Sequence, residues 1–292
     1  MIQVTANRVE HIRPLRGILF AGGASVETRR TYQKLHMKIM SRLGFLSSVV
    51  LLLGVLLSTN AVAKILFKAD FESGDFRQFG PLSRKVRAGD IAVDTAVVHA
   101  GKYAGRFTIH EDDVFNAGQL RAQAFGPEVK VEEGADTFVS FYVYMKEPPK
   151  DRDNFFYWEG RPPPGYNNVM TWWVEPRKDG AGTLVKYGTG NLGRNGVLWE
   201  AEFTIGHWHQ LGMHVHWSED PAKGNVKLWW DGTVVLDKRV KTKGPQSVYF
   251  SQPGIHRSPH ARSVDTIYFD DIICATTLEE IEIRRPETPK SK

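Results

Sequence analysis

The sequence predicts an all-β protein, built as a sandwich of two antiparallel sheets. Three observations support this fold class. From Lys64 onward, short stretches of alternating apolar and polar residues recur, Gly, Pro, Asn and Asp separate them, and no helical period lasts longer than a turn or two. Because successive side chains of a strand point to opposite faces of its sheet, such stretches bury one face and leave the other to solvent.

The expected strands are rich in tryptophan, tyrosine and valine, which pack well on a half-buried pleated surface. They cover residues 104–109, 137–145, 168–174, 211–217, 226–230 and 267–273. In 211–217 the odd positions are apolar and the even ones include His214 and His216, so one face should meet the core and the other water. The clearest hairpin turns at Asp231-Gly232, which suits the positive φ angles of a type I′ turn.

The N-terminal region resembles a targeting segment. Residues 44–58 form an almost unbroken apolar run that follows Lys38 and Arg42 and precedes Ala61-Val62-Ala63. A basic start, an apolar stretch shorter than the roughly 20 residues of a membrane span and a small-residue site are typical of a secretory signal peptide. We therefore expect a signal peptide at 37–63 and an upstream extension or mis-assigned start at 1–36. The alternative is a cytoplasmic extension before an uncleaved signal anchor.

The positive charge of the chain is concentrated before Lys64. Residues 1–63 hold eight of the 38 Lys and Arg and two of the 33 Asp and Glu, which leaves 30 basic and 31 acidic residues. This near-neutral balance gives no reason to expect DNA or RNA binding.

We expect a monomer that is secreted or periplasmic and has no stable membrane anchor.

Residues 64–278 are expected to form one domain, since sandwiches of about 200–250 residues are common single units. Residues 146–166 hold five prolines and a group of aromatics, and they read as a long loop that either carries function or is a poorly ordered insertion. The charged segment 279–292 lacks core residues and is expected to fray. The single cysteine, Cys274, excludes an internal disulfide and should be a buried, inert thiol.

Four pieces of the sequence carry a resemblance to a known family. They are residues 69–74 (ADFESG), Arg121-Ala122-Gln123, residues 206–232 with their Trp-Asp-Gly turn, and residues 249–257 with 268–272. Together they resemble the polysaccharide lyases of the heparin lyase I, glucuronan lyase and alginate lyase type. This resemblance implies a concanavalin A-like jelly roll that cleaves a uronate-containing polysaccharide by β-elimination, with an acidic glycan as the partner.

The sequence departs from the residues that this family usually carries. Gln123 stands where those lyases have a glutamate, and Met170-Thr171-Trp172 stands where they have Gln-x-His. Ser251 and His256 replace a lysine and a tyrosine near the end of the domain. A strict copy of the family's catalytic set is therefore absent, which concerns the reaction and not the architecture.

Elimination at a uronate requires neutralising its carboxylate, removing the adjacent proton and protonating the leaving oxygen. Arginine and amide side chains suit the first task, and histidine or tyrosine suits the others. We therefore place Arg121, Gln123 and Asn168 around the carboxylate and assign His256 and Tyr249 as base and acid. For His256 the alternative is a solvated loop histidine.

Two further residues are candidates for substrate binding. Trp172, or its neighbour Trp173, can stack on a sugar ring, although a sandwich core also needs tryptophan. Arg257 can bind substrate or be a surface charge. Each side chain therefore has a structural alternative.

One structural Ca²⁺ is expected, because Asp70, Glu72, Asp270 and Asp271 supply oxygen ligands near both ends of the domain. The alternative is that these acids are solvated strand ends. Four histidines, at 207, 209, 214 and 216, lack the cysteine or carboxylate spacing of a zinc site.

Other function classes remain open beside a lyase. A non-catalytic carbohydrate-binding module fits the missing Gln-x-His, and a structural or adhesive surface protein would have no groove. Retaining glycoside hydrolysis requires two carboxylates about 5 Å apart, and the sequence lacks the strand pattern that supplies them.

Overall fold

The computed structural model describes residues 64–82, 90–113, 119–161, 167–192, 196–261 and 263–284. These ranges hold fifteen strands and two single-turn 3-10 helices, Gly190–Leu192 and Glu279–Ile281, and every strand pairing is antiparallel. The expected signal peptide lies outside the described residues. Within the described ranges, no helix has the length and apolarity that crossing a membrane requires.

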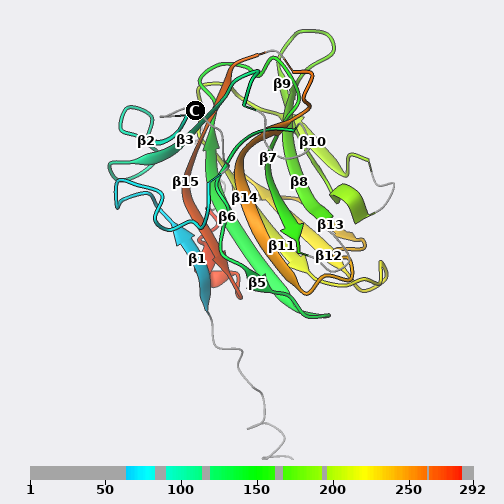
Figure 1. Ribbon diagram of the computed structural model, residues 1–292. Coiled ribbons are helices and arrows are strands. Elements are labelled where there is room, and N and C mark those ends of the chain that lie inside the picture. Colours follow the sequence, from blue (N-terminus) through cyan, green and yellow to red (C-terminus); the bar gives the residue numbers. More distant parts are fainter. Residues whose placement is uncertain are drawn as a thin grey trace, which may run out of the picture. The chain divides into compact units, whose positions relative to one another are not determined.

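The first sheet has eight strands in the order β13-β12-β11-β6-β15-β3-β2, with β1 paired to β15 beside this path (Figure 1). Its strands are β1 (Ile65–Ala69), β2 (Ile91–Asp94), β3 (Ala104–Ile109), β6 (Asp136–Tyr144), β11 (His209–His216), β12 (Asn225–Trp230), β13 (Thr233–Arg239) and β15 (Asp265–Ala275).

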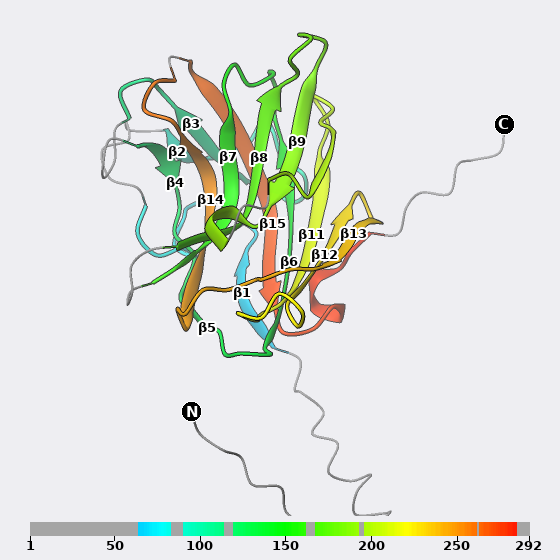
Figure 2. The ribbon, with the colours of Figure 1, turned by 90° about the vertical axis from the view of Figure 1, so that its right-hand side faces the viewer.

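The second sheet has seven strands in the order β10-β9-β8-β7-β14-β4, with β5 paired to β14. Its strands are β4 (Leu120–Gln123), β5 (Val129–Lys130), β7 (Asp153–Gly160), β8 (Asn167–Pro176), β9 (Thr183–Gly188), β10 (Trp199–Glu202) and β14 (Val248–Arg257). Figure 2 shows the two sheets as neighbouring layers. The predicted sandwich of two antiparallel sheets is therefore confirmed.

Aromatic side chains from both sheets fill the core between the layers. Phe141 of β6 stacks on Phe156 of β7 with ring centroids 4.6 Å apart, and Trp158 of β7 packs edge-on against Trp217. Burying such large apolar surfaces is the main stabilising term of a fold that has no disulfide. Cys274 is buried as expected, and burial raises the pKa of its thiol to about 12.

All six predicted strands are present, as β3, β6, β8, β11, β12 and β15; β3 has the predicted bounds and the other five have shifted ends. The predicted hairpin joins β12 to β13, and both turn residues have positive φ, 48° at Asp231 and 79° at Gly232. In β11 the odd positions are buried, whereas His214 and His216 are half-buried. The alternation of the sequence therefore identified the core-facing side of this strand correctly.

The reading of residues 146–166 as one long loop is wrong, because β7 lies inside this segment. All but one of its residues are buried, since one face packs in the core and the other is covered by polar neighbours. A strand that is buried on both faces loses the alternation that reveals most strands. The prolines of this segment flank β7 and do not interrupt it.

The C-terminal segment is packed as far as Arg284, where fraying was expected. Ile281 is fully buried, and its carbonyl accepts a hydrogen bond from Ser140 Oγ at 2.6 Å. The side chain of Gln210 holds the next turn, donating to Glu282 O and accepting from Arg284 N. Residues 285–292 lie outside the described residues.

Arg257 is a buried structural residue, so the suggestion that it binds substrate or is a surface charge is wrong. Its guanidinium lies 2.7 Å from Asp153 Oδ1 of β7 and 2.8 Å from Asp265 Oδ2 of β15. The side chain is 0% exposed, so both ion pairs are shielded from water. Burial also raises the pKa of Asp153 well above its ordinary value. This cluster links β7 and β14 of one sheet to β15 of the other.

We predict that Arg257→Gln lowers the free energy of unfolding by about 3–5 kcal/mol, because it leaves two buried carboxyl groups without their cation. Denaturant unfolding followed by circular dichroism measures the change. The matched control is Arg177→Gln in the exposed β8–β9 turn, which should leave the free energy of unfolding almost unchanged, because water screens its ion pair with Asp179. Equal stability of the two variants would contradict a structural role for Arg257.

Candidate active site

Three adjacent strands of the second sheet, β7, β14 and β4, carry a polar cluster on the face that points away from the core. From Phe156 to Glu159 the side chains of β7 alternate, so Phe156 and Trp158 enter the core while Tyr157 and Glu159 take the opposite face. We call the following residues the polar cluster: Arg121 and Gln123 of β4, Tyr157 and Glu159 of β7, and Gln252 and His256 of β14.

Gln252 is the centre of the hydrogen bonds in the polar cluster. Its Oε1 lies 2.8 Å from Tyr157 OH and 3.5 Å from Arg121 Nη1, and both groups donate to it. Its Nε2 donates to Glu159 Oε2 at 2.5 Å. Tyr157 OH also lies 3.1 Å from Gln123 Oε1, and Arg121 Nη1 lies 4.0 Å from Glu159 Oε2. The cluster therefore holds one arginine, one carboxyl group and one phenol in fixed orientations.

His256 stands directly opposite Arg121 in the pairing of β14 with β4. The two strands approach closely at Gly254, whose φ is 121° and where a Cβ atom would lie 2.3 Å from the carbonyl oxygen of Ala122. Only glycine fits there, because it has no Cβ and tolerates positive φ. The register of β14 against β7 shifts between Pro253 and His256, whereas the pairing of β14 with β4 continues without a shift and keeps His256 beside Arg121.

The imidazole of His256 is neutral and carries a free lone pair. Its Nε2 lies 3.1 Å from Gln119 Oε1, and since that oxygen accepts, Nε2 holds the proton. Its Nδ1 is buried and has no hydrogen-bond partner among the described residues. Burial, aided by the charge of Arg121, lowers the pKa of His256 to about 3. A neutral histidine beside a cation is ready to accept a proton when the cation is neutralised by an anionic ligand.

Two other groups of the polar cluster have raised pKa values. Burial raises the pKa of Tyr157 above its ordinary value, so its phenol stays protonated and can donate. Burial also raises the pKa of Glu159, although Gln252 and Arg121 oppose this shift. Titratable groups with perturbed pKa values that gather on one face are typical of functional sites.

A cavity of about 340 Å³ opens beside the polar cluster, within the range of about 300–1,000 Å³ common for ligand pockets. Tyr157 and His256 form its border with the cluster. The remaining lining comes from β7 and the residue before it, from β8, and from the end of β9 and the segment after it, namely Arg152, Asn154, Asn168, Thr171, Trp173, Gly188, Gly190, Asn191, Gly196 and Val197. This side of the sandwich is therefore hollowed. A structural or adhesive protein without a groove would instead have a flat surface here.

The structure brings together four of the seven predicted catalytic and substrate-binding residues. Arg121, Gln123 and His256 belong to the polar cluster, and Asn168 lines the adjoining cavity. Two of the other three point into the core. Tyr249 is fully buried against Trp217, with ring centroids 5.0 Å apart. The assignment of Tyr249 as the acid is therefore wrong, because alternation along β14 places it on the opposite face from Gln252.

Trp172 also faces the core, where it packs against Tyr187 and Trp199, so its assignment to sugar stacking is wrong. The reason is an irregularity in β8. Met170 has a φ of 52°, and the pairing with β7 shifts its register between Phe156 and Trp158. This shift places the alternative residue, Trp173, at the cavity.

Sequence reasoning missed Tyr157, Glu159 and Gln252. The first two lie in β7, where the flanking prolines predict a loop, so the sequence assigns them to no strand face. Gln252 precedes a proline in β14, and no motif identifies it. The signal that could have identified this strand is the run of aromatic residues between the two groups of prolines, because aromatic residues are enriched in strands.

The four acids expected to bind calcium lie on β15 and just after β1, which pair with each other. Asp70 forms an ion pair with Lys68 at 3.3 Å, and Asp271 lies 3.1 Å from His99 Nδ1. Glu72 Oε1 accepts hydrogen bonds from the amides of residues 102 and 103, and Asp270 Oδ2 accepts from those of residues 99 and 100. Glu72 and Asp270 therefore bind the two ends of the loop at residues 99–103 through its backbone amides. Calcium at this place stays a prediction.

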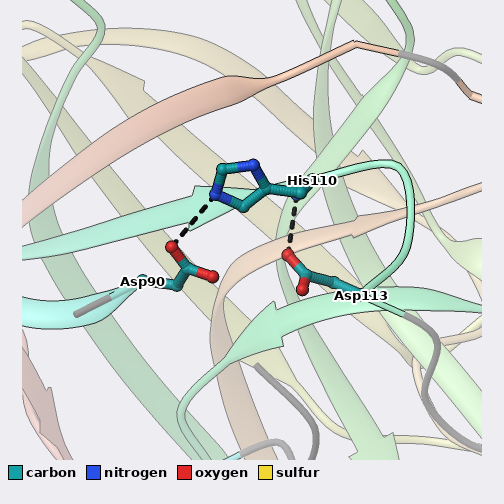
Figure 3. Close-up of side chains that lie close together, drawn as sticks. All are labelled: Asp90, His110 and Asp113. Atoms are coloured by element: carbon teal, nitrogen blue, oxygen red, sulfur yellow. Dashed lines mark hydrogen bonds and ion pairs between the residues drawn. The ribbon is translucent and has the colours of Figure 1, made fainter. Parts of the chain in front are cut away.

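Among the described residues, one group of three side chains places His and carboxylate ligand atoms within 4.8 Å of one another: Asp90, His110 and Asp113 (Figure 3). His110 Nε2 lies 3.0 Å from Asp90 Oδ1, and the backbone N–H of His110 donates to Asp113 Oδ2 at 2.7 Å. The first bond joins the residue after β3 to the residue before β2, and the second closes the turn that follows β3. They give the group a structural role without an ion.

Comparisons with known proteins agree with this architecture. The chain matches the family described as "Polysaccharide lyase" over residues 71–273. Among solved structures, an endo-beta-1,4-glucuronan lyase from the fungus Trichoderma reesei aligns with a TM-score of 0.58 at 15% identity, covering 76% of this chain and 100% of that one. Alginate lyase A1-II′ of polysaccharide lyase family-7 aligns with a TM-score of 0.49 at 10% identity, covering 66% and 86%.

A third similar structure is the catalytic domain of a GH131 beta-glucanase from Podospora anserina. Its TM-score is 0.46 at 9% identity, and the alignment covers 72% of this chain and 95% of that one. No curated protein matches the sequence.

We predict that His256 makes the protein less stable in acid. Its pKa is about 3 when folded and about 6.5 when unfolded, so between these values the unfolded chain binds the extra proton. The free energy of unfolding should therefore fall as the pH drops from about 6.5 toward 3, by at most about 1.4 kcal/mol per unit from this group. The His256→Asn variant should show a shallower fall in denaturant titrations across this range. Parallel curves for the two proteins would contradict the burial of a neutral imidazole.

Proposed function

Because the chain belongs to the polysaccharide lyase family, we propose that it cleaves a uronate-containing polysaccharide by β-elimination at the polar cluster. One observation carries the proposal: the cation of Arg121 lies beside a neutral His256 whose Nδ1 has no partner among the described residues. This pair offers the two functions that start an elimination, charge neutralisation and proton abstraction.

Arg121 neutralises the carboxylate of the sugar that is cleaved. A proton on the carbon beside a carboxylate is removed more easily when a cation or strong hydrogen-bond donors stabilise the negative charge that develops. Arg121 is a strong donor to carboxylates because its guanidinium is planar and always charged. Gln123 and Gln252 flank it and can donate amide hydrogens to the same carboxylate once the hydrogen bonds among them rearrange.

His256 Nδ1 accepts the proton from the carbon beside the carboxylate, and Tyr157 donates its phenolic proton to the glycosidic oxygen. The electron pair of the broken C–H bond forms the double bond as the C–O bond to the leaving sugar breaks. Tyr157 takes the part that sequence analysis gave to Tyr249. Its raised pKa keeps it protonated, and it borders the cavity next to His256. His256 then releases its proton to solvent, and Tyr157 takes up a proton from solvent, so both groups return to their starting states.

Glu159 positions the arginine in this scheme. Its carboxyl group lies 4.0 Å from the guanidinium of Arg121 and accepts a hydrogen bond from the amide of Gln252. These two contacts hold the guanidinium and the amide in one orientation. Burial raises the pKa of Glu159, which weakens its competition with the substrate carboxylate for Arg121.

Glucuronan is the first substrate to test, because the lyase from Trichoderma reesei has this substrate in its name. We further propose that the protein acts outside the cytoplasm, on the basis of the signal-like segment at 37–63. A non-catalytic glycan-binding module is the competing function, and the missing Gln-x-His is the observation that favours it. Cleavage separates the two functions.

We predict that the protein converts glucuronan, alginate, heparin or pectate into unsaturated products, which absorb in the ultraviolet. His256→Ala and Tyr157→Phe should each lower kcat by about 10²–10⁴, the usual contribution of a general base or acid. Arg177→Gln is the control and should keep full activity, because it lies in an exposed turn away from the cavity. A flat absorbance trace on all four polymers, with glycan binding retained, would favour the binding module.

We also propose that Glu72 and Asp270 hold one structural Ca²⁺. Asp270 is 1% exposed, and burial raises its pKa to about 7, yet it forms no ion pair with a described lysine or arginine. A buried carboxylate of this kind suits a hard cation that accepts oxygen ligands. The ion would tie the loop at residues 99–103 to β15 and to the end of β1. Asp70 and Asp271 already have basic partners. The proposed calcium ligands are therefore two of the four predicted acids, Glu72 and Asp270.

The expected result is a melting temperature that rises with Ca²⁺ and falls with a chelator. At a concentration one hundred times the Kd, binding adds about 2.7 kcal/mol, and each kcal/mol raises the Tm of a domain of this size by about 2–4 °C. Asp270→Asn should remove the response, whereas Asp237→Asn, an exposed acid on β13, should keep it. An unchanged response in Asp270→Asn would contradict this ligand set.

A further inference from the structure

A row of four side chains crosses the second sheet from the cavity to the polar cluster. Trp173 of β8 pairs with Asn154 of β7, Asn154 pairs with His256 of β14, and His256 pairs with Arg121 of β4. Adjacent strands lie about 4.8 Å apart, so three steps separate Trp173 from Arg121 by about 14 Å. This span is longer than one sugar ring. Figure 1 allows the strand order β8, β7 and β14 to be followed.

A second cation stands at the far end of this row. The guanidinium of Arg152, just before β7, lies over the ring of Trp173 with Cζ 4.2 Å from its centroid. Arg152 is exposed and forms no ion pair within 4.0 Å of any carboxylate that the structure describes. The nearby acid Glu175 is already engaged by Lys186 at 2.9 Å and by the indole N–H of Trp173 at 3.1 Å. The charge of Arg152 is therefore available to a ligand.

The cavity between the two cations also offers an unsatisfied acceptor. Asn154 Oδ1 is buried and has no hydrogen-bond partner among the described residues, although Asn154 lines the cavity. Asn168 and Thr171 line the same space. A buried acceptor without a partner is unfavourable unless a ligand or water donates to it, and sugar hydroxyls are suitable donors.

We propose that this cavity binds the sugar next to the one that is cleaved, and that Arg152 pairs with the carboxylate of this neighbouring sugar. The polysaccharide then lies across the strands along the row from Trp173 to Arg121. The ring of Trp173 holds the guanidinium of Arg152 in place by a cation–π contact. The ring face that Arg152 covers is therefore not available for stacking on the sugar. The inference deepens the proposed function and rests on it, since it requires acidic sugars at two successive positions.

The test compares a hexamer of glucuronan with cellohexaose, which has the same linkage but no carboxylates. Calorimetry measures binding, and ultraviolet absorbance measures elimination, for the wild type, Arg152→Gln, Arg152→Lys and the control Arg177→Gln. We expect Arg152→Gln to weaken binding of the glucuronan hexamer and raise its KM about tenfold or more, with little change in kcat. Binding of cellohexaose should not change, and Arg152→Lys should restore part of the loss.

The two readouts separate the inference from the proposed function. If the wild type eliminates glucuronan and Arg152→Gln keeps the wild-type KM, the inference is overturned and the function stands. If the wild type binds the hexamer in an Arg152-dependent way but produces no unsaturated sugar, the function is overturned and the subsite stands. If the wild type neither binds nor cleaves the hexamer, both are overturned for this polymer.

Discussion

The ion pairs of Arg257 hold the part of the molecule on which the candidate site depends. Arg257 is the last residue of β14, and it reaches through the core to Asp153 of β7 and Asp265 of β15. A buried ion pair adds little net stability compared with a well-packed apolar core, but it specifies one arrangement, because any other leaves a charge unpaired. Here it fixes the ends of three strands from both sheets. Alternation then requires that the preceding side chain, His256, point out of the core.

The chemistry of the outer face follows from this constraint. The approach of β14 to β4 at Gly254 sets His256 against Arg121, and the same strands bring Gln252 to Tyr157 and Glu159. Low water access then shifts each pKa away from its ordinary value: His256 is kept neutral and Tyr157 protonated. An acid, a base and a cation thus share one face without neutralising one another. Preorganisation of this kind is what an elimination requires, since the charge that develops must find its partner already in place.

Much of the fold was predictable from the sequence, because one-sided burial produces alternation. The sequence correctly identifies the Asp231-Gly232 hairpin and the strands that have one solvent-facing side, such as β11. The sequence does not identify β7, which is buried on both faces, and so it does not identify Tyr157 and Glu159 as members of the site. Tyr249 and Trp172 were assigned to the wrong face, in Trp172's case because positive φ at Met170 shifts the register of β8. Such irregularities leave little trace in a single sequence. Arg121, Gln123 and His256 were found through a family resemblance, whereas the contacts that orient them join strands far apart in the chain.

In the proposed mechanism, the polar cluster breaks the glycosidic bond by elimination and not by adding water. Mass spectrometry of the fragments from a purified glucuronan oligomer tests this directly. Elimination predicts fragment masses that sum to the mass of the parent oligomer, with one new double bond in the fragment that carried the cleaved uronate. Fragments whose masses exceed the parent by one water molecule would show hydrolysis and contradict the roles given to Arg121, His256 and Tyr157.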